Sequence, residues 1–184
     1  KQVALRVEGK EIELDRAILD ELGDPLVHLL RNAVDHGIAA APERAANGKP
    51  PHGRIGISLH PTGAQLTLRL SDDGRGLDLP RIRDKAVASG LVPEGRHLTP
   101  AETAQLVFAP GFSTASAVTA VSGRGVGMDA VKTFVESVGG SIALELGPSR
   151  EGSEHVPFQT VIHLPAHYGE AQRTPAEFAE EAAR

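Results

Sequence analysis

The chain has 184 residues, of which 40% are apolar and only 3% aromatic, with neither tryptophan nor cysteine. This length predicts one domain with an aliphatic core, and the lack of cysteine excludes disulfides and thiolate metal sites. The formal net charge of −5, with scattered lysines and arginines, argues against nucleic-acid binding. No apolar run is long enough to span a bilayer and no signal-peptide pattern opens the chain, so we expect a cytoplasmic protein without membrane insertion.

The first elements are predicted from alternation and capping residues. Apolar residues alternate on both sides of a Gly9-Lys10 turn, which predicts a small hairpin. Asp15 is expected to cap a short helix that ends at Gly23. Asp24-Pro25 then places a capping carboxylate before a proline, which predicts the start of a second helix running to about Ile38.

The middle of the chain predicts a connection followed by a pair of strands. Residues 39–53 contain three prolines and two glycines and are expected to form the connection. Isoleucines and leucines alternate over residues 55–59 and 66–70, on either side of Pro61-Thr-Gly63. This pattern predicts two antiparallel strands joined by a turn.

The second half predicts further helices, two strands and a polar tail. The helices are expected at 78–90, 100–108 and 126–138, and the strands at 142–146 and 158–164. Residues 109–123 lack periodicity and are expected to form a mobile loop, and the tail from Tyr168 holds at most a peripheral helix. Antiparallel strands with about three long helices predict an α+β two-layer sandwich, with the helices covering one sheet face.

The first of three chemical motifs is His28-Leu-Leu-Arg-Asn32-Ala-Val-Asp35-His36-Gly37. At 100° per residue, His28, Asn32, Asp35 and His36 share a polar arc opposite the apolar face of the predicted helix. The amide oxygen of Asn32 suits a Mg²⁺ ion surrounded by phosphate oxygens, and His28 lies one turn earlier. Taken alone, the pattern also fits a solvated polar helix face.

The second motif, Asp72-Asp-Gly74-Arg-Gly76, follows a predicted strand. Asp72 offers a carboxylate that accepts a hydrogen bond from an exocyclic amine such as the adenine 6-amino group. Gly74 and Gly76 let the backbone lie close to a flat ring. A plain surface turn is the alternative, because Asp and Gly are ordinary turn residues.

The third motif, Gly123-Arg-Gly125-Val-Gly127-Met-Asp129, immediately precedes a predicted helix. Free backbone amides and the positive end of the helix dipole can hold phosphate there. The segment is neither a Walker A loop nor a dinucleotide fingerprint, because no Gly-Lys-Ser/Thr follows and no βαβ unit surrounds it. A flexible hinge is the alternative.

In this order, the three motifs resemble the GHKL (Bergerat-type) ATP-binding domain of gyrase, Hsp90, MutL and histidine kinases. The amino-acid sequence of the motifs is most similar to that of the catalytic domain of the chemotaxis kinase CheA. Residues 21–37 resemble its N box, Pro110-Gly-Phe-Ser-Thr114 its lid phenylalanine segment, and residues 121–132 its second glycine box. The resemblance implies a mixed, mostly antiparallel sheet in a catalytic domain over residues 1–167, with a flexible ATP lid at about 90–124 and a polar tail over 168–184.

The same resemblance implies roles for individual residues. Asn32 and His28 would be catalytic, Asn32 and His36 would bind Mg²⁺, and Asp72 would select adenine. The residues expected to bind ATP are Arg31, Asn32, Asp35, His36, Asp72, Gly74, Gly76, Arg81, Lys85, Ser122, Gly123, Arg124, Gly125, Val126, Gly127, Met128 and Thr160.

The implied activity is transfer of the γ-phosphoryl group of ATP to a histidine on a separate phosphotransfer domain. The implied partners are that acceptor domain, the dimerisation and coupling domains of a parent kinase, and a response regulator downstream. Gyrase-like and Hsp90-like ATPases usually carry Glu where this chain has His28, which favours phosphotransfer over hydrolysis. A GHKL-type ATPase and a nucleotide-binding regulatory module without turnover are the alternatives, the latter because Ala115-Ser-Ala117 offers no lysine and residues 152–160 depart from the family's Gly-Thr-x-Phe segment.

Overall fold

The computed structural model describes residues 1–112, 127–149 and 154–171. Its main strands are β1 (Val3–Glu8), β3 (Gly53–Thr62), β4 (Gln65–Asp72), β6 (Ser141–Leu146) and β8 (Phe158–Pro165). In the described part of the chain they form one five-stranded sheet in the order β1-β3-β4-β8-β6. Only the β1–β3 neighbours in this sheet are parallel.

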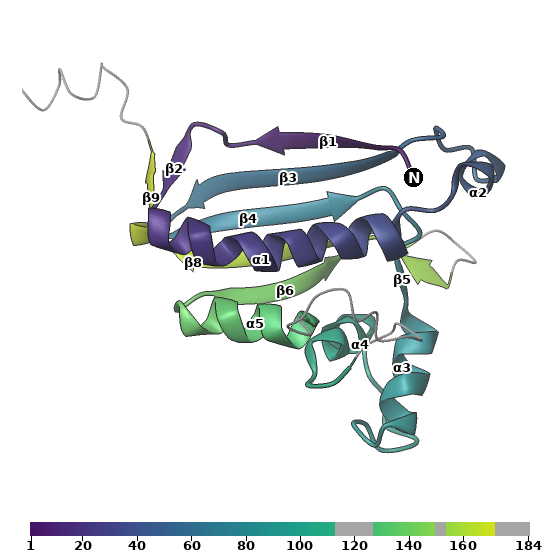
Figure 1. The fold of residues 1–184 in the computed structure, drawn as a ribbon. Helices are drawn as coiled ribbons and strands as arrows, with labels where there is room; N and C mark the ends of the chain where they lie inside the picture. Colours follow the sequence, from purple (N-terminus) through teal and green to yellow (C-terminus); the bar gives the residue numbers. More distant parts are fainter. Residues whose placement is uncertain (113–126, 150–153, 172–184) are drawn as a thin grey trace, which may run out of the picture.

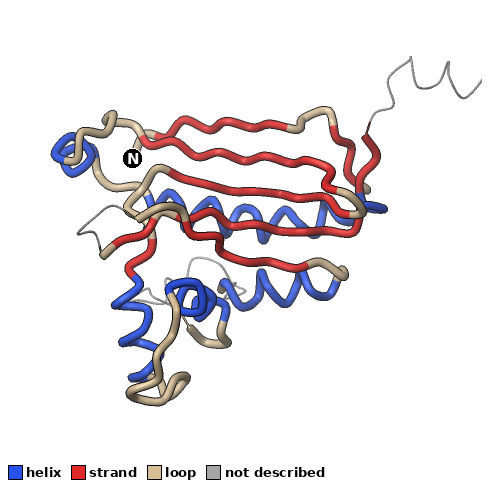
Figure 2. The backbone as a smooth tube through the Cα atoms, turned by 180° about the vertical axis from the view of Figure 1, so that it is seen from behind, coloured by secondary structure: helices blue, strands red, loops and turns tan. Residues whose placement is uncertain are grey.

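Helices cover one face of this sheet (Figure 1), and the opposite face is open when the molecule is seen from behind (Figure 2). The longer helices are α1 (Arg16–Asn32), α3 (Leu79–Ala88) and α5 (Met128–Ser137). The shorter ones are η1, a π-helix (Ala33–Gly37), α2 (Ala41–Ala46), α4 (Pro100–Gln105) and the 3-10 turns η2 (Leu106–Phe108) and η3 (Ala166–Tyr168). The predicted α+β two-layer sandwich is confirmed (Figures 1 and 2).

The core lies between the sheet and the helices and is aliphatic, as the composition predicts. Alternate residues of β4 and β8, such as Leu68 and Ile162, face α1 and α5 and pack with Leu22, Val131 and Val135. Their burial is the main driving force for the fold, at about 25 cal/mol per Å² of apolar surface.

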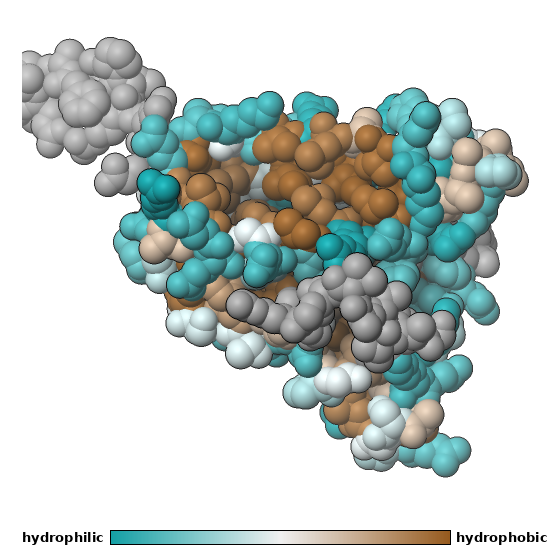
Figure 3. All heavy atoms as spheres, in the orientation of Figure 1, coloured by the Kyte–Doolittle hydropathy of each residue, from teal (hydrophilic) through white to brown (hydrophobic). Residues whose placement is uncertain are grey.

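The helix layer leaves part of β1 uncovered. Leu5 and Val7 of β1 and Val27 of α1 are exposed, and Figure 3 shows apolar side chains gathered on this face between β1 and α1.

The predicted break between two helices at Gly23 and Asp24-Pro25 is wrong, because α1 runs through them without interruption. Asp15 caps this helix as predicted, and its carboxylate accepts a hydrogen bond from Ala17 N at 2.8 Å. Ile18, Leu22, Pro25 and Leu29 are buried at helical spacing, so they form a single stripe along the sheet. Packing of this stripe outweighs the helix-ending preference of the Gly-Asp-Pro sequence.

The predicted N-terminal hairpin is also wrong. β1 pairs in parallel with β3, whereas β2 (Ile12–Leu14) pairs with β9 (Gly169–Ala171). The predicted alternation and turn are present, but both strands find their partners far away in sequence. β9 places the first residues of the predicted polar tail in the fold, and the remainder of that tail lies outside the described residues.

Most other predicted elements are confirmed. β3 and β4 form the predicted antiparallel pair, Asp78 caps α3, and Thr99 and Glu102 form a capping box at the start of α4. Residues 39–53 are more than a connection, because they contain α2. Sequence reasoning missed the small pair of β5 (Leu77–Asp78) and β7 (His155–Val156), which lies beside the second motif.

Within the described residues, no helix is both long and apolar enough to cross a membrane.

Candidate functional site

The first part of the candidate site joins α1 to the start of α5. The amide nitrogen of Asn32 lies 2.9 Å from His28 Nε2 and donates to the sulfur of Met128 at 3.5 Å. Both amide hydrogens are therefore used, while the amide oxygen has no hydrogen-bond partner within the described part of the chain. The predicted N-box helix and the end of the predicted glycine motif thus meet at Asn32.

His28 is a neutral imidazole in this arrangement. An amide nitrogen can only donate, so Nε2 of His28 accepts and the proton of the neutral ring lies on Nδ1. Partial burial and the nearby charge of Arg31 lower the pKa of His28, and the carboxylate of Asp129 partly opposes them. The lowered pKa keeps the ring unprotonated at neutral pH, which preserves its contact with Asn32.

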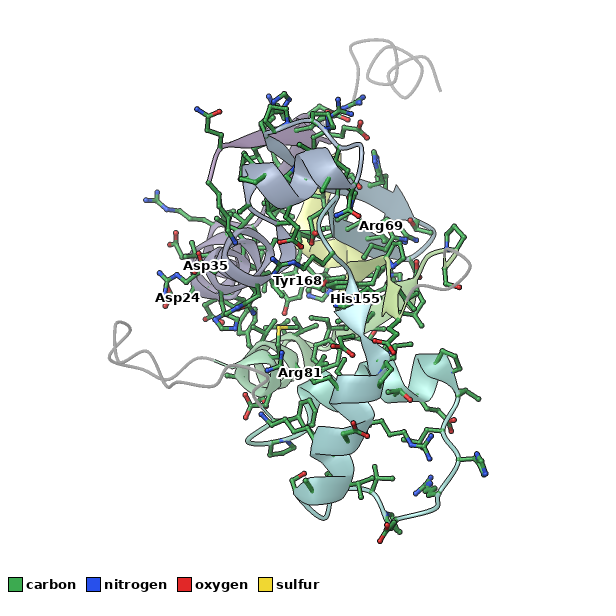
Figure 4. The ribbon with its side chains drawn as sticks, turned by 90° about the vertical axis from the view of Figure 1, so that its right-hand side faces the viewer. Asp24, Asp35, Arg69, Arg81, His155 and Tyr168 are labelled. Carbon is green, nitrogen blue, oxygen red and sulfur yellow. The ribbon has the colours of Figure 1, made fainter. Side chains whose placement is uncertain are left out.

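The π-helix η1 carries two polar residues of the first motif, Asp35 and His36, beyond Asn32. Arg31, Asp35 and His36 are exposed, and Figure 4 shows Asp35 on the outer side of this helix. The predicted arc of four ligand-capable groups is therefore split, because a π turn changes the phase set by 100° per residue. The structure brings His28 and Asn32 together and leaves His36 at the surface.

The second part of the site lies where β4 ends against Gly37. Asp72 Oδ1 accepts a hydrogen bond from Gly74 N at 2.8 Å, and Gly37 O accepts one from Arg75 N at 2.9 Å. A Cβ atom at Gly74 would lie 2.2 Å from Gly37 O, and one at Gly37 would lie 3.0 Å from Asp72 Oδ1. Both glycines are thus required by the close approach of this loop to the helix end.

Burial raises the pKa of Asp72, and the hydrogen bond from Gly74 N partly opposes this. Thr160 is buried on the neighbouring strand β8, opposite Leu70, so it lies on the same sheet face and one diagonal step from Asp72. Gly76 has a φ of 92°, and a Cβ atom there would lie 2.5 Å from Val156 O. The Asp72 carboxylate is therefore partly buried next to Gly74 and Thr160, on the helix-covered face of the sheet.

The third motif is described only from Gly127 onward, and Ser122, Gly123, Arg124, Gly125 and Val126 lie outside the described residues. Gly127 precedes the first residue of α5. Asp129, in the first turn of α5, accepts hydrogen bonds from Ala130 N at 2.9 Å and Gly111 N at 3.3 Å. A Cβ atom at Gly127 would lie 2.4 Å from Asp129 Oδ1, so glycine leaves room for this carboxylate.

The cations predicted on α3 lie next to the start of the predicted lid. Lys85 Nζ lies 5.4 Å from the centre of the Phe112 ring, within cation–π range. Arg81 lies one turn earlier, and Figure 4 shows it on α3 below the helix that carries Asp35. Because Gly111 also contacts Asp129, a series of neighbours links α3 to α5 and from there to Asn32.

A magnesium ion fits Asn32 by the chemistry of the donors. Within residues 1–112, 127–149 and 154–171, no group of three or more His, Cys, Asp or Glu could hold a metal ion. Mg²⁺ usually keeps several waters and binds to one or two protein oxygens plus substrate phosphates, for which one free amide oxygen suffices. The residues present therefore favour a metal that arrives with a phosphate ligand.

Two hollows lie apart from these residues. One of about 230 Å³ lies on the open sheet face between Arg6 and Arg69, where Gly56 has no side chain. The other, of about 330 Å³, lies beside Lys1 and Pro51. Neither is lined by a predicted site residue.

Sequence reasoning missed the charged residues that support the second motif. Arg44 and Lys49 contact Asp73 and Gly74, and both come from the segment that was expected to be a simple connection. A charged side chain in a segment rich in proline and glycine carries no periodic signal, so only the fold reveals these contacts.

The chain is a GHKL ATPase domain of the histidine kinase type. A family model described as "Histidine kinase-, DNA gyrase B-, and HSP90-like ATPase" matches residues 21–167, and the chain belongs to this family.

Its relatives include chemotaxis proteins. The chain is similar to the chemotaxis protein CheA of Treponema pallidum, at 44% identity over 78% of this chain and 18% of that protein. It is equally similar to CheA of Bacillus subtilis, at 44% identity over 79% of this chain and 22% of that protein. The chain thus spans about a fifth of the length of these relatives. Among solved structures, the mycobacterial sensor histidine kinase MprB aligns with a TM-score of 0.49 and 22% identity, over 93% of this chain and 85% of that one.

Proposed function

We propose that this chain binds Mg²⁺–ATP and transfers the γ-phosphoryl group to a histidine on a separate phosphotransfer domain. One observation carries the proposal: both amide hydrogens of Asn32 are engaged by His28 and Met128, and its oxygen has no hydrogen-bond partner among the described residues. Asn32 ends α1, which continues into η1, and η1 contacts the Asp72 loop through Gly37. Gly37 ends this single π turn, so Asn32 and Gly37 lie about one helical turn apart. One extended ligand can therefore reach both.

Asn32 supports metal binding at the phosphate end of this ligand. The amide nitrogen of Asn32 donates to two acceptors, which prevents a 180° flip of the amide group. The amide oxygen therefore has a fixed orientation. Bound Mg²⁺ would neutralise charge on the phosphate oxygens as the γ-phosphoryl group leaves. His36 and Arg31 are exposed on neighbouring turns and remain candidate contacts for the metal and the phosphates.

Asp72 supports recognition of adenine at the other end. Its carboxylate is mostly enclosed and accepts one hydrogen bond from Gly74 N, which leaves lone pairs for the adenine 6-amino group. Guanine carries an oxygen at this position, and an ionised carboxylate repels it. Thr160, Gly74 and Gly76 border the same spot and are the proposed neighbours of the base.

His28 favours transfer over hydrolysis. Its Nε2 is already the acceptor for Asn32, so this nitrogen is not free to take a proton from an attacking water. His28 therefore orients Asn32, and the nucleophile comes from outside the chain. Positioning and charge neutralisation supply the rate enhancement in such a transfer.

The proposal extends to the organisation of the parent protein. In this proposal the catalytic domain comprises residues 1–167 with the lid at about 90–124, and the first residues of the 168–184 tail extend the domain by pairing β9 with β2. The acceptor domain, the dimerisation and coupling domains and a response regulator belong to the rest of the system, which we place in the cytoplasm. The similarity to CheA chemotaxis proteins favours a role in chemotaxis-type signalling.

The test mixes the chain with a purified histidine phosphotransfer domain, Mg²⁺ and ATP labelled at the γ-phosphate. We expect label on the acceptor in a form that is stable to alkali and lost in acid, as a phosphohistidine is. Release of inorganic phosphate without acceptor would instead indicate an ATPase. Binding of ATP without either product would indicate a regulatory module.

A further inference from the structure

Arg44 has the largest fully buried side chain in the described part of the protein, although it is charged. It projects from α2, at the same end of the molecule as the C-terminal end of β4 (Figure 1). A buried guanidinium is costly unless every donor is paired, so its surroundings show what it holds in place.

All five N–H donors of Arg44 are used. Two pair with the carboxylate of Asp73, through Nη1 at 3.0 Å and Nη2 at 2.8 Å, and Nη1 also donates to Asp73 O at 3.3 Å. The remaining two donate to Pro50 O at 2.7 Å and His52 O at 3.0 Å. Arg44 thus ties the residue next to Asp72 to the segment that enters β3.

Lys49 completes the attachment from the same segment. Its ammonium donates to Asp73 O at 2.8 Å and to Gly74 O at 2.7 Å. Asp73 Oδ1 also accepts from Arg54 N at 2.9 Å, and Arg75 forms an ion pair with Glu43 of α2. Each residue from 73 to 75 is therefore fixed by a charged side chain of residues 43–49, whereas the carboxylate of Asp72 accepts its hydrogen bond from Gly74 N.

We propose that Arg44 and Lys49 are positioning residues for base selection: they hold the Asp73–Gly74 backbone so that the Asp72 carboxylate keeps a fixed place against Gly37. This inference rests on the proposed function, because it takes Asp72 as the group that recognises adenine. Two hydrogen bonds connect Lys49 to the Asp72 carboxylate through Gly74. Asp72 Oδ1 is set by Gly74 N, and Gly74 is set by Lys49 and by its close approach to Gly37 O. When these contacts are lost, the loop becomes mobile and the Asp72 carboxylate no longer has a fixed orientation. The site then no longer distinguishes adenine from guanine.

The experiment measures Mg²⁺–ATP and Mg²⁺–GTP binding by calorimetry for the full chain and for Arg44→Lys, Lys49→Met and Lys49→Arg. We expect Arg44→Lys and Lys49→Met to weaken ATP binding and to narrow the ATP-over-GTP preference by roughly tenfold, the usual worth of one charged hydrogen bond. Lys49→Arg keeps a positive charge and hydrogen-bond donors on a side chain of different shape, so it should narrow the ATP-over-GTP preference less than Lys49→Met does.

Arg69→Met is the matched control for charge. It also removes one cation, but from the ion pair with Glu145 on the open sheet face, so we expect it to keep the nucleotide preference. A second control tests the route through Asp72. In an Asp72→Asn background, Lys49→Met should cause no further change in the ATP-to-GTP ratio, because coupled residues are not additive.

Three outcomes would overturn the inference. The first is that folded Arg44→Lys and Lys49→Met variants keep the wild-type ATP-over-GTP preference. The second is that these variants lose affinity for ATP and GTP equally, which indicates a merely structural role. A further narrowing of the ratio in the Asp72→Asn background would exclude the route through Asp72. If Arg44→Lys does not fold, Lys49→Met decides alone, because its contacts are with two loop carbonyls. A wild type that binds ATP and GTP equally would instead remove the assignment of Asp72, and this inference with it.

Discussion

The two ends of the candidate site are built differently. At the Asn32 end, side chains from two helices meet, and only a few contacts fix them. At the Asp72 end, the backbone of the loop packs directly against the backbone of η1, and Gly74 is too close to Gly37 O for any side chain. The buried guanidinium of Arg44 holds the loop through Asp73. We infer that the base end is preorganised before the nucleotide binds. The phosphate end depends on the Mg²⁺ and phosphate groups that arrive with the nucleotide.

The largest expected effect is at the phosphate end. Asn32→Ala removes the one free amide oxygen proposed for Mg²⁺, so phosphotransfer should fall by about a hundredfold or more, comparable to the loss of one transition-state donor. Nucleotide binding should lose its Mg²⁺ dependence. The measurement is labelled transfer to the acceptor, with calorimetry at varied Mg²⁺.

Asn47→Ala provides the matched control for this prediction. Asn47 is exposed and its side chain donates only to Glu43 O in α2, so transfer should remain close to the wild type. Full transfer activity in Asn32→Ala would mean that the phosphate end is built around another residue.

The next largest effect tests the tightness of the base end. In Gly74→Ala, the added Cβ would lie 2.2 Å from Gly37 O, so either the loop or η1 must move. We expect ATP affinity to fall by roughly ten- to a hundredfold, while the amplitude of far-UV circular dichroism is retained. Unchanged affinity would show that the base end adapts as readily as the phosphate end.

Asp72→Asn separates recognition from stability at the same position. Because burial raises the pKa of Asp72, its ionisation at neutral pH opposes folding, and this cost appears as the pH rises through the raised pKa. We expect the uncharged variant to melt at a higher temperature than the wild type at pH 7, yet to lose roughly tenfold in ATP-over-GTP preference.

The same group predicts a pH dependence of binding. The 6-amino group of adenine needs an unprotonated acceptor, so wild-type ATP affinity should decline as the pH falls through the raised pKa of Asp72. In Asp72→Asn this decline should be smaller, because the contribution of the carboxylate is removed while His28 still titrates. Titration calorimetry between pH 7 and pH 4 checks both, and an identical pH profile in the two proteins would contradict the role of the carboxylate.

Sequence patterns predicted the parts of the fold that depend on nearby residues. The β3–β4 pair and the capping box at Thr99 each follow from a few adjacent side chains. The partners of β1 and β2 are distant in sequence, and alternation cannot tell a hairpin from two separate pairings. His28 and Asn32 were found because a helix fixes their spacing, whereas the support from Arg44 depends on tertiary contacts between distant segments.

The smallest effect tests whether α1 is one helix, since both ends of the site lie at its C-terminal end and in η1. A Cβ atom at Gly23 would have no neighbour within 4 Å, and its φ is not positive. Gly23→Ala should therefore stabilise the protein by about 0.5–1 kcal/mol, because alanine lowers the entropy cost of helix formation. If α1 ended at Gly23, the same change would destabilise the helix end. Denaturant unfolding of the two proteins gives the sign, which decides whether the buried residues from Ile18 to Leu29 belong to one continuous helix that leads into the site.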